Sequence, residues 1–295
     1  MFQVEILPSI LSKMMSHEPF NKLSNKLIDN DIFVKNDFGT MHLTNTGEII
    51  FSTIFLIITI LIYFVSRYIF STFSKIYQGL KRKEKMFWDL AVVRGIFGFF
   101  GSSCCFYERF FDTELQTNIA KATTVQSSIL IASCLGFFTF EVLAQITFDV
   151  MFKTFSKALH AHHFVSITGF LLTVYYDLGH YFPIWVFTLE MSTLFSCISF
   201  CLMKAKAVEN LFWKINQLIL IYVFHLRSVI EFTILYEIWY YWDLKKSMPF
   251  FWNFNLIFGL CLIAFVLTPY WTFRKTEQYF KKADWNDTER RKKSQ

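Results

Sequence analysis

The sequence lacks the features that define several protein classes. Its six cysteines lie inside apolar segments, with neither paired loop positions nor a C-x-x-C spacing, so they are expected to be reduced residues of a core. Charged residues make up only 18% of the chain. The basic ones do not share a soluble module, which argues against nucleic-acid binding. The chain also lacks a filter-like loop and a repeated-arginine sensor, and therefore does not resemble a channel. Its first residues lack the basic start and apolar run of a signal peptide, so none is expected.

Apolar residues, in contrast, are abundant. Hydrophobic residues form 54% of the 295 positions, aromatic residues form 20%, and 38 residues are phenylalanine. The phenylalanines fall in clusters that are separated by charged patches, a pattern typical of several membrane spans rather than one water-soluble core. We therefore predict an all-α polytopic membrane protein, with about seven transmembrane helices in one bundle. The predicted spans are Ile49–Ser66, Met86–Tyr107, Thr123–Asp149, Phe155–Tyr176, His180–Met203, Leu211–Trp239 and Phe250–Trp271.

The distribution of basic residues predicts the orientation of this bundle. With seven spans, the loops that follow the odd-numbered spans and the C-terminal tail carry seventeen Lys and Arg, against eight on the other side. Because cytosolic loops are enriched in these residues, the N-terminus is predicted to be lumenal and the C-terminus cytosolic. The predicted organisation is a lumenal segment (1–48), a first transmembrane helix (49–73), a domain of six further helices (75–272) and a cytosolic basic tail (273–295).

Many ionisable and amide side chains interrupt the predicted spans. A charge near the centre of a bilayer costs at least about 2.5 kcal/mol, so such residues need partners, water or a function. Counted from the nearest cytosolic lysine at about 1.5 Å per residue, they extend from the cytosolic interface to slightly past the midplane. We expect them to line a polar cavity that opens to the cytosol; for any single residue, a purely structural role remains the alternative. The expected cavity residues are Asp89, Arg94, Glu141, Asp149, Asn216, His225 and Arg227.

Three histidines lie close together in the fourth span, in the stretch "HAHH" (160–163). Adjacent residues of a helix point about 100° apart, which suits a single metal ion poorly, and the spacing matches no metal motif. No metal site is therefore expected. His162 and His163 are instead candidates for a general base or nucleophile, with Glu190 as the acid that holds the tautomer. His160, which is nearest to Lys157, is expected to be interfacial.

An adjacent histidine pair on a middle helix of a polytopic core resembles the TLC domain, a family shared with the ceramide synthases. Longer blocks strengthen the likeness, among them "KEKMFWDLAVVRGIFG" (83–98), "LEMSTLFSCIS" (189–199) and "ENLFWKINQ" (209–217). The resemblance implies a protein of the endoplasmic reticulum that cycles through the ER–Golgi intermediate compartment and supports lysosome function and lipid metabolism. The ceramide synthases use their histidine pair for acyl-CoA-dependent acyl transfer, so the resemblance further implies lipid chemistry of this kind or lipid sensing. Acyl-CoA is the candidate co-substrate, and no other cofactor is expected.

The sequence departs from the ceramide synthases at the helix after the histidine pair. There Glu190 is the single acid, where those enzymes carry aspartates, so the acceptor stays open between a glycerophospho-type and a sphingoid precursor. Two other roles also stay open: a cargo receptor for newly made lysosomal enzymes, and a non-catalytic lipid sensor. Lys292 and Lys293 have the positions of a dilysine retrieval signal, which coat proteins read. The expected partners are therefore membrane lipids, coat proteins and lysosomal enzymes in the lumen.

Overall fold

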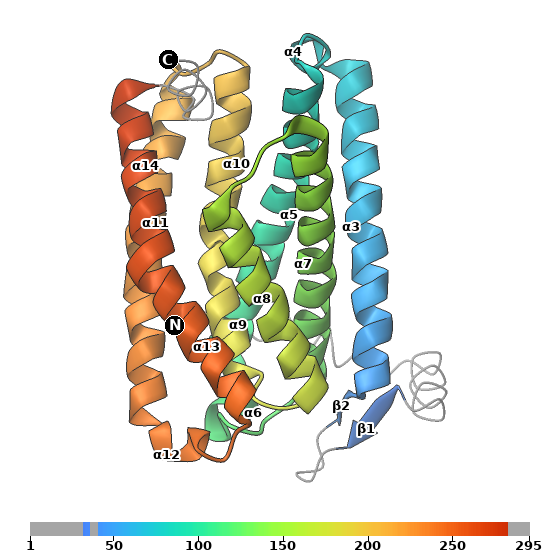
Figure 1. Cartoon of the computed structure of the whole chain (residues 1–295), viewed down its shortest axis with the longest axis vertical. Coiled ribbons are helices and arrows are strands. Elements are labelled where there is room, and N and C mark those ends of the chain that lie inside the picture. Colours follow the sequence, from blue (N-terminus) through green and yellow to red (C-terminus); the bar gives the residue numbers. More distant parts are fainter. Residues whose placement is uncertain (1–31, 36–40, 283–295) are drawn as a thin grey trace, which may run out of the picture.

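The computed structural model describes residues 32–35 and 41–282, which form a bundle of long helices side by side (Figure 1). The long elements are α3 (Asn45–Phe73), α5 (Arg82–Phe111), α7 (Val125–Phe152), α8 (Lys157–Tyr176), the continuous run α9 (Tyr181–Phe187), η1 (Thr188–Glu190) and α10 (Met191–Lys204), then α11 (Leu211–Tyr240) and the continuous run α13 (Phe250–Leu262), η2 (Ile263–Leu267) and α14 (Thr268–Lys281). The short elements are β1 (Phe33–Lys35), β2 (Met41–Leu43), α4 (Lys75–Gln78), α6 (Thr113–Thr117) and α12 (Trp242–Lys245).

Six of the helical runs in the described residues are long and apolar enough to cross a membrane. These runs are α3, α5, α7, the run from α9 to α10, α11 and the run from α13 to α14. The remaining predicted span, the fourth, corresponds to α8, a helix of 20 residues whose composition is more polar because it carries the histidines. The prediction of an all-α polytopic membrane protein is thus confirmed, whereas the orientation of the termini stays a prediction.

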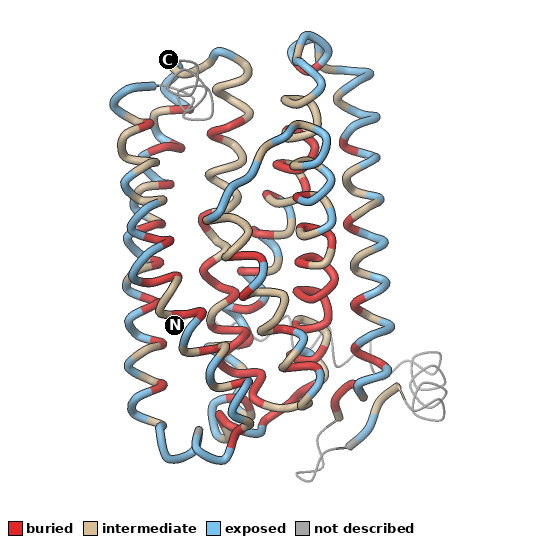
Figure 2. Tube along the Cα trace, viewed as in Figure 1, coloured by how far each residue is buried: buried red, intermediate tan, exposed pale blue. Residues whose placement is uncertain are grey.

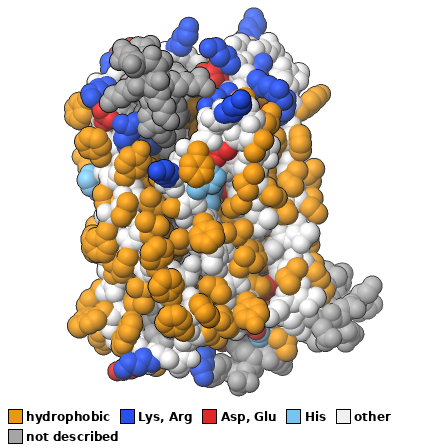
Figure 3. Space-filling view, in the orientation of Figure 1, with side chains coloured by type: hydrophobic (Ala, Val, Ile, Leu, Met, Phe, Trp, Pro, Cys, Tyr) orange, Lys and Arg blue, Asp and Glu red, His pale blue; other side chains and the backbone are white. Residues whose placement is uncertain are grey.

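The two ends of the bundle differ in chemistry. We call the end with α4, the α7–α8 connection and the last turn of α14 the basic end, and the end with β1, β2, α6 and α12 the hairpin end (Figure 1). Figure 3 shows lysine and arginine gathered at the basic end, and hydrophobic side chains over the flank between the two ends. An apolar belt between polar ends is what a hydrocarbon layer about 30 Å thick requires.

Side-chain caps fix where several helices begin. The hydroxyl of Thr44 accepts a hydrogen bond from the backbone N–H of Gly47 at 3.1 Å, which starts α3. Thr124 and Ser127 form a reciprocal capping box at the start of α7, and Asn210 accepts from the N–H of Phe212 at 3.0 Å before α11. Each cap satisfies N–H groups that have no partner within the helix, which matters most where water is scarce.

Helix α3 packs with its small and polar face inward and its large apolar side chains outward. Its buried residues include Gly47, Ser52 and Thr59, whereas Phe64 and Tyr68 are exposed. A lipid-facing helix cannot gain hydrophobic energy by turning leucines inward, so small residues at the contact let the backbones approach closely. This packing places α3 directly against α7, the most buried of the long helices (Figure 2).

The structure differs from the sequence expectation at both termini. The segment predicted to precede the first helix ends at 48, yet α3 already begins at Asn45, and before it β1 and β2 pair antiparallel with Val34 opposite His42. The predicted tail begins at 273, but α14 continues to Lys281, because Glu277 pairs with Arg274 at 3.0 Å and with Lys281 at 2.6 Å. Pairs three and four residues apart support a helix beyond its apolar part. The predicted retrieval signal, Lys292 and Lys293, lies outside the described residues.

Candidate functional site

The histidine pair His162 and His163 lies in the second turn of α8 and is buried in the bundle. Residues 153–156 run inward from the end of α7, so α8 begins deeper in the bundle than the end of α7 (Figure 1). The two imidazole centroids are 5.4 Å apart. The ring of Phe138, from α7, contacts both imidazoles edge-on at about 6 Å, with centroid distances of 6.0 and 6.2 Å. The pair is therefore held by the helix and by an aromatic floor.

Glu190 is the carboxylate beside His162. Its Oε1 lies 3.3 Å from Nε2 of His162, and its Oε2 accepts a hydrogen bond from the Thr193 hydroxyl at 2.6 Å. Glu190 ends the 3₁₀ turn η1 and caps α10, so the turn sets the direction in which its side chain leaves the backbone. Besides the imidazole of His162, the Glu190 carboxylate contacts a neutral hydroxyl and not a lysine or arginine side chain of the described residues.

Glu141, on α7, is the carboxylate beside His163. Its Oε2 lies 3.5 Å from Nε2 of His163, and the same oxygen is 2.8 Å from Nε and 2.7 Å from Nη2 of Arg94 on α5. Glu141 is 1% exposed. The Arg94 guanidinium thus neutralises most of the charge that would otherwise act on His163.

Arg227, on α11, completes the cluster on the opposite side. It donates to Ser192 at 2.9 Å and to Thr268 at 3.4 Å, and its Nε lies 3.7 Å from Glu231 one turn further along α11. Trp271 lies between Arg227 and the histidine pair: its ring centroid is 5.7 Å from the Arg227 guanidinium and 5.6 Å from the centroid of the His162 ring. The structure therefore brings together side chains from α5, α7, α8, α10, α11 and α14.

The cluster leaves one nitrogen of each histidine available for chemistry. A carboxylate beside Nε2 favours the tautomer that carries its proton on that atom. The lone pair then sits on Nδ1, and among the described residues neither Nδ1 of His162 nor that of His163 has a hydrogen-bond partner. An imidazole oriented by a carboxylate on one nitrogen and free on the other is the arrangement of a general base.

Three of the expected cavity residues have structural partners outside this cluster. Asp89 accepts a hydrogen bond from the Tyr77 hydroxyl at 2.8 Å, near the basic end. Asp149 contacts Nε2 of His160 at 2.6 Å, which ties the end of α7 to the start of α8. Asn216 donates to a backbone carbonyl of α10 at 2.9 Å. These contacts fix the ends and crossings of helices rather than the surroundings of the histidine pair.

His225 was expected to line the cavity, and the structure corrects this assignment. The residue is exposed on the outer face of α11. Two residues are about 200° apart on a helix, so the face that turns Arg227 inward turns His225 outward. The helical periodicity alone would therefore have predicted, from the sequence, that His225 and Arg227 lie on opposite faces of the helix.

Sequence reasoning missed Thr268 and Trp271. The Thr268 hydroxyl is buried and donates to Glu231 at 2.6 Å, and Trp271 stands one turn further along α14 on the same side. The structure contains a feature that points to these two residues: Ile263–Leu267, directly before Thr268, form a π-helix. Such segments often occur at functional sites, where they shift the register of the side chains that follow.

Comparison with known proteins identifies the family of the chain. The family model of the TLC domain matches residues 48–275. Protein CLN8 of Homo sapiens is 34% identical over 227 residues, which cover 76% of this chain and 79% of that protein. Protein CLN8 of Canis lupus familiaris is 35% identical and that of Mus musculus 34%, with the same coverage. No solved structure matches the chain. The match spans all the helices that build the histidine cluster, and the chain belongs to the TLC-domain family.

Proposed function

We propose that this protein is an acyl-CoA-dependent lipid acyltransferase of the endoplasmic reticulum membrane. The observation that carries the proposal is the buried pair of histidine–carboxylate contacts, His162 with Glu190 and His163 with Glu141. A cluster this costly to bury is a functional candidate by default in a membrane protein. Membership of a family that includes the ceramide synthases supports acyl transfer in particular.

His162 is the better candidate for the general base. Within residues 32–35 and 41–282, the hydrogen bond that its partner Glu190 accepts besides the His162 contact comes from the neutral Thr193 hydroxyl. The charge of Glu190 can therefore stabilise the imidazolium that forms when His162 takes a proton. The partner of His163, Glu141, is already paired with Arg94. We assign His163 and Arg94 to positioning the thioester and its developing oxyanion.

The proposed reaction balances without a further cofactor. Nδ1 of His162 takes the proton from a hydroxyl or amine of the acceptor lipid. The oxygen or nitrogen that loses this proton attacks the thioester carbonyl of acyl-CoA. The new C–O or C–N bond forms, the C–S bond breaks, and the proton leaves with coenzyme A as its thiol. Arg227, whose donors already face the interior of the cluster, is suited to a phosphate of a glycerophospho-type acceptor.

The test is transfer from labelled acyl-CoA by the purified chain, with glycerophospho-alcohols and sphingoid bases as acceptors. The His162→Gln and His163→Gln variants are compared with His225→Gln, which changes the same residue type on the exposed face of α11. General-base catalysis contributes about 10²–10⁴-fold, so His162→Gln should lower kcat/KM by that factor. Equal transfer by all three variants would exclude both histidines from the chemistry.

The location rests on the family resemblance and on the charge at the basic end, which we propose to be cytosolic. Acyl-CoA is made in the cytosol, and α8 starts on the basic-end side of the bundle (Figure 1). Glycosylation acceptor sites placed in loop 118–124 should be modified if the hairpin end is lumenal, whereas sites placed in loop 205–210 should not. The opposite pattern would reverse the orientation.

A cargo receptor for lysosomal enzymes is the second candidate. The folded β1–β2 hairpin favours it, because this element adds ordered surface at the end proposed to be lumenal. Co-precipitation of lysosomal enzymes with the wild-type chain, and its loss when the hairpin sequence 33–43 is replaced by a Gly-Ser linker, would support the receptor role. Binding of those enzymes by His162→Gln would show that the two functions are separate.

A further inference from the structure

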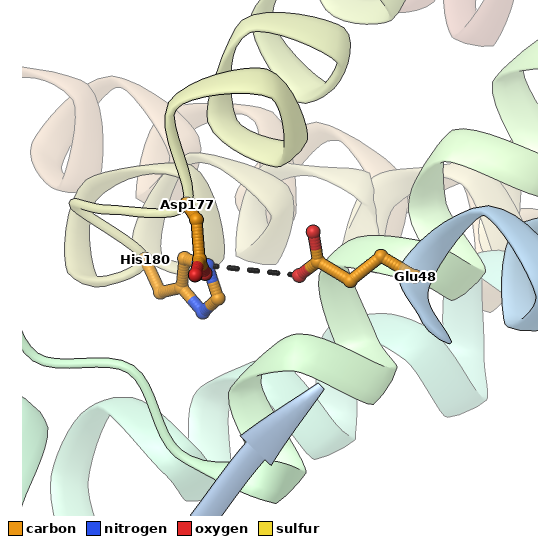
Figure 4. Close-up of side chains that lie close together, drawn as sticks. All are labelled: Glu48, Asp177 and His180. Carbon is orange, nitrogen blue, oxygen red and sulfur yellow. Dashed lines mark ion pairs between the residues drawn. The ribbon is translucent and has the colours of Figure 1, made fainter. Parts of the chain in front are cut away.

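A second buried set of ionisable side chains lies at the hairpin end, distinct from the histidine pair. It consists of Glu48 in the first turn of α3, Asp177 at the C-terminal cap of α8, and His180 immediately before α9 (Figure 4). Asp177 is fourteen residues after His163, which is about 21 Å along a helix axis. Neither the proposed chemistry nor the basic end involves this set.

The three side chains converge on one point. One oxygen of each carboxylate and one imidazole nitrogen all lie within 4.8 Å of one another, and Nε2 of His180 is 3.8 Å from Oε1 of Glu48. Glu48 and His180 are both 0% exposed. Three of these atoms have no hydrogen-bond partner among the described residues: both carboxylate oxygens of Glu48 and Nε2 of His180. Polar groups buried so completely normally have partners, and here several atoms without one point at the same space.

The hydrogen bonds behind His180 set its tautomer. Its Nδ1 is 2.9 Å from the Ser127 hydroxyl, and that hydroxyl donates its own proton to the carbonyl of Thr124 at 3.0 Å. With that proton donated to the Thr124 carbonyl, Ser127 is the acceptor and Nδ1 of His180 the donor. This leaves a lone pair on Nε2 facing a carboxylate oxygen of Glu48, an arrangement that a metal cation between the two atoms would satisfy. A metal-bound histidine is held in the same way, by a hydrogen bond from its other nitrogen.

The backbone fixes this geometry. Asp177 adopts the left-handed conformation with φ of 48°, and Gly179 has φ of +71°. A side chain at Gly179 would meet Met248 and Trp252, so the turn between α8 and α9 is pressed against the rest of the bundle. The tight turn brings Asp177 and His180 to one side, where α3 presents Glu48. The three groups are thus preorganised by elements that are far apart in the sequence.

We propose that Glu48, Asp177 and His180 bind a divalent transition-metal ion, with zinc the best fit. One imidazole and two carboxylates match the nitrogen and oxygen ligands of zinc, whereas calcium requires six to eight oxygens. A fourth position is open to water or to His42 of β2, whose Nδ1 is 3.4 Å from Asp177. The ion ties the first turn of α3 and the hairpin to the α8–α9 turn. The sequence-based expectation of no metal rested on the spacing of the histidines at 160–163, and these three residues were not among the candidates.

The test is the zinc content of the purified full chain. The protein is stripped with a chelator in detergent, incubated with Zn²⁺ alone and dialysed, and its metal is measured by mass spectrometry. We expect about one zinc per wild-type chain, and loss of most of it in Glu48→Gln and in His180→Asn. The matched control is Glu108→Gln, another buried glutamate, which should retain the ion.

Two further measurements keep the proposal testable if a variant folds poorly. Asp177→Asn changes a partly exposed ligand, and a folded Asp177→Asn protein should bind zinc at least tenfold more weakly. Zinc should also raise the melting temperature of the wild type and of Glu108→Gln, and not that of Glu48→Gln. A wild-type chain that holds no zinc after dialysis, or ligand variants that bind as much as Glu108→Gln, would overturn the proposal. Because acyl transfer is assayed separately, its failure and that of zinc binding are distinguishable.

Discussion

Glu141 and Glu48 are buried glutamates on neighbouring helices, α7 and α3, yet their surroundings differ. Glu141 faces the guanidinium of Arg94 and the imidazole of His163. Glu48 faces only Asp177 and His180, and its oxygens accept no hydrogen bond from the described residues. The histidine cluster on α8 therefore contains its own counter-charges, as a site for reversible proton transfer needs. The hairpin-end cluster consists of two carboxylates and an imidazole with unused lone pairs, as a site for an added cation needs.

The largest expected effect comes from removing the counter-charge of Glu141. Arg94→Met leaves this carboxylate buried without its cation, which typically costs about 3–5 kcal/mol of stability. The double variant Arg94→Met with Glu141→Gln should recover much of that loss, because no uncompensated charge remains. Thermal unfolding in detergent measures both. A double variant that is as unstable as Arg94→Met alone would mean that packing, not charge, dominates at this position.

A smaller effect is expected at the hydroxyl that orients Glu190. Thr193→Val removes the 2.6 Å hydrogen bond to Oε2, and a hydrogen bond to a charged group is worth about 1.5–3 kcal/mol. Thr168→Val is the control, since that hydroxyl is exposed and bonds only to a carbonyl of its own helix. Equal stabilities of the two variants would indicate that Glu190 is held by His162 alone.

The contact between α3 and α7 offers a way to disturb the hairpin-end cluster without touching the histidine pair. A Cβ at Gly136 would lie 2.4 Å from the backbone oxygen of Ser52, so Gly136→Ala should force α3 outward at a cost of about 1–3 kcal/mol. Gly95→Ala meets only ordinary contacts of 3.5 Å or more and should be neutral or slightly stabilising. Both variants are compared in zinc content and in thermal unfolding. If Gly136→Ala matches Gly95→Ala in both measurements, the close contact between α3 and α7 does not hold Glu48 in place.

The smallest effect is expected at His225. Its side chain is exposed on α11, so His225→Gln should change the free energy of unfolding by less than about 0.5 kcal/mol. Acyl transfer should also stay at the wild-type level. A substantial loss of either would return His225 to the site from which the structure removes it.

The sequence was sufficient for the features that depend on local composition. Apolar length predicts the long helices, and the cost of charges in lipid singles out His162, His163 and Glu190. Burial is harder to predict, because two residues along one helix are enough to turn Arg227 inward and His225 outward. Interactions across the bundle could not be predicted: Thr268 contacts Glu231 from another helix, directly after a π-helical segment that sequence periodicity does not reveal. The hairpin-end cluster was missed because Glu48 lies more than a hundred residues before Asp177 and His180.

The most direct test of the central claim is acyl transfer by His162→Gln in parallel with His225→Gln, with both variants confirmed as folded by size-exclusion chromatography. If His162 is the general base, its variant loses about 10²–10⁴-fold in kcat/KM for transfer from labelled acyl-CoA, while His225→Gln matches the wild type. Transfer by His162→Gln at the wild-type rate would contradict the account.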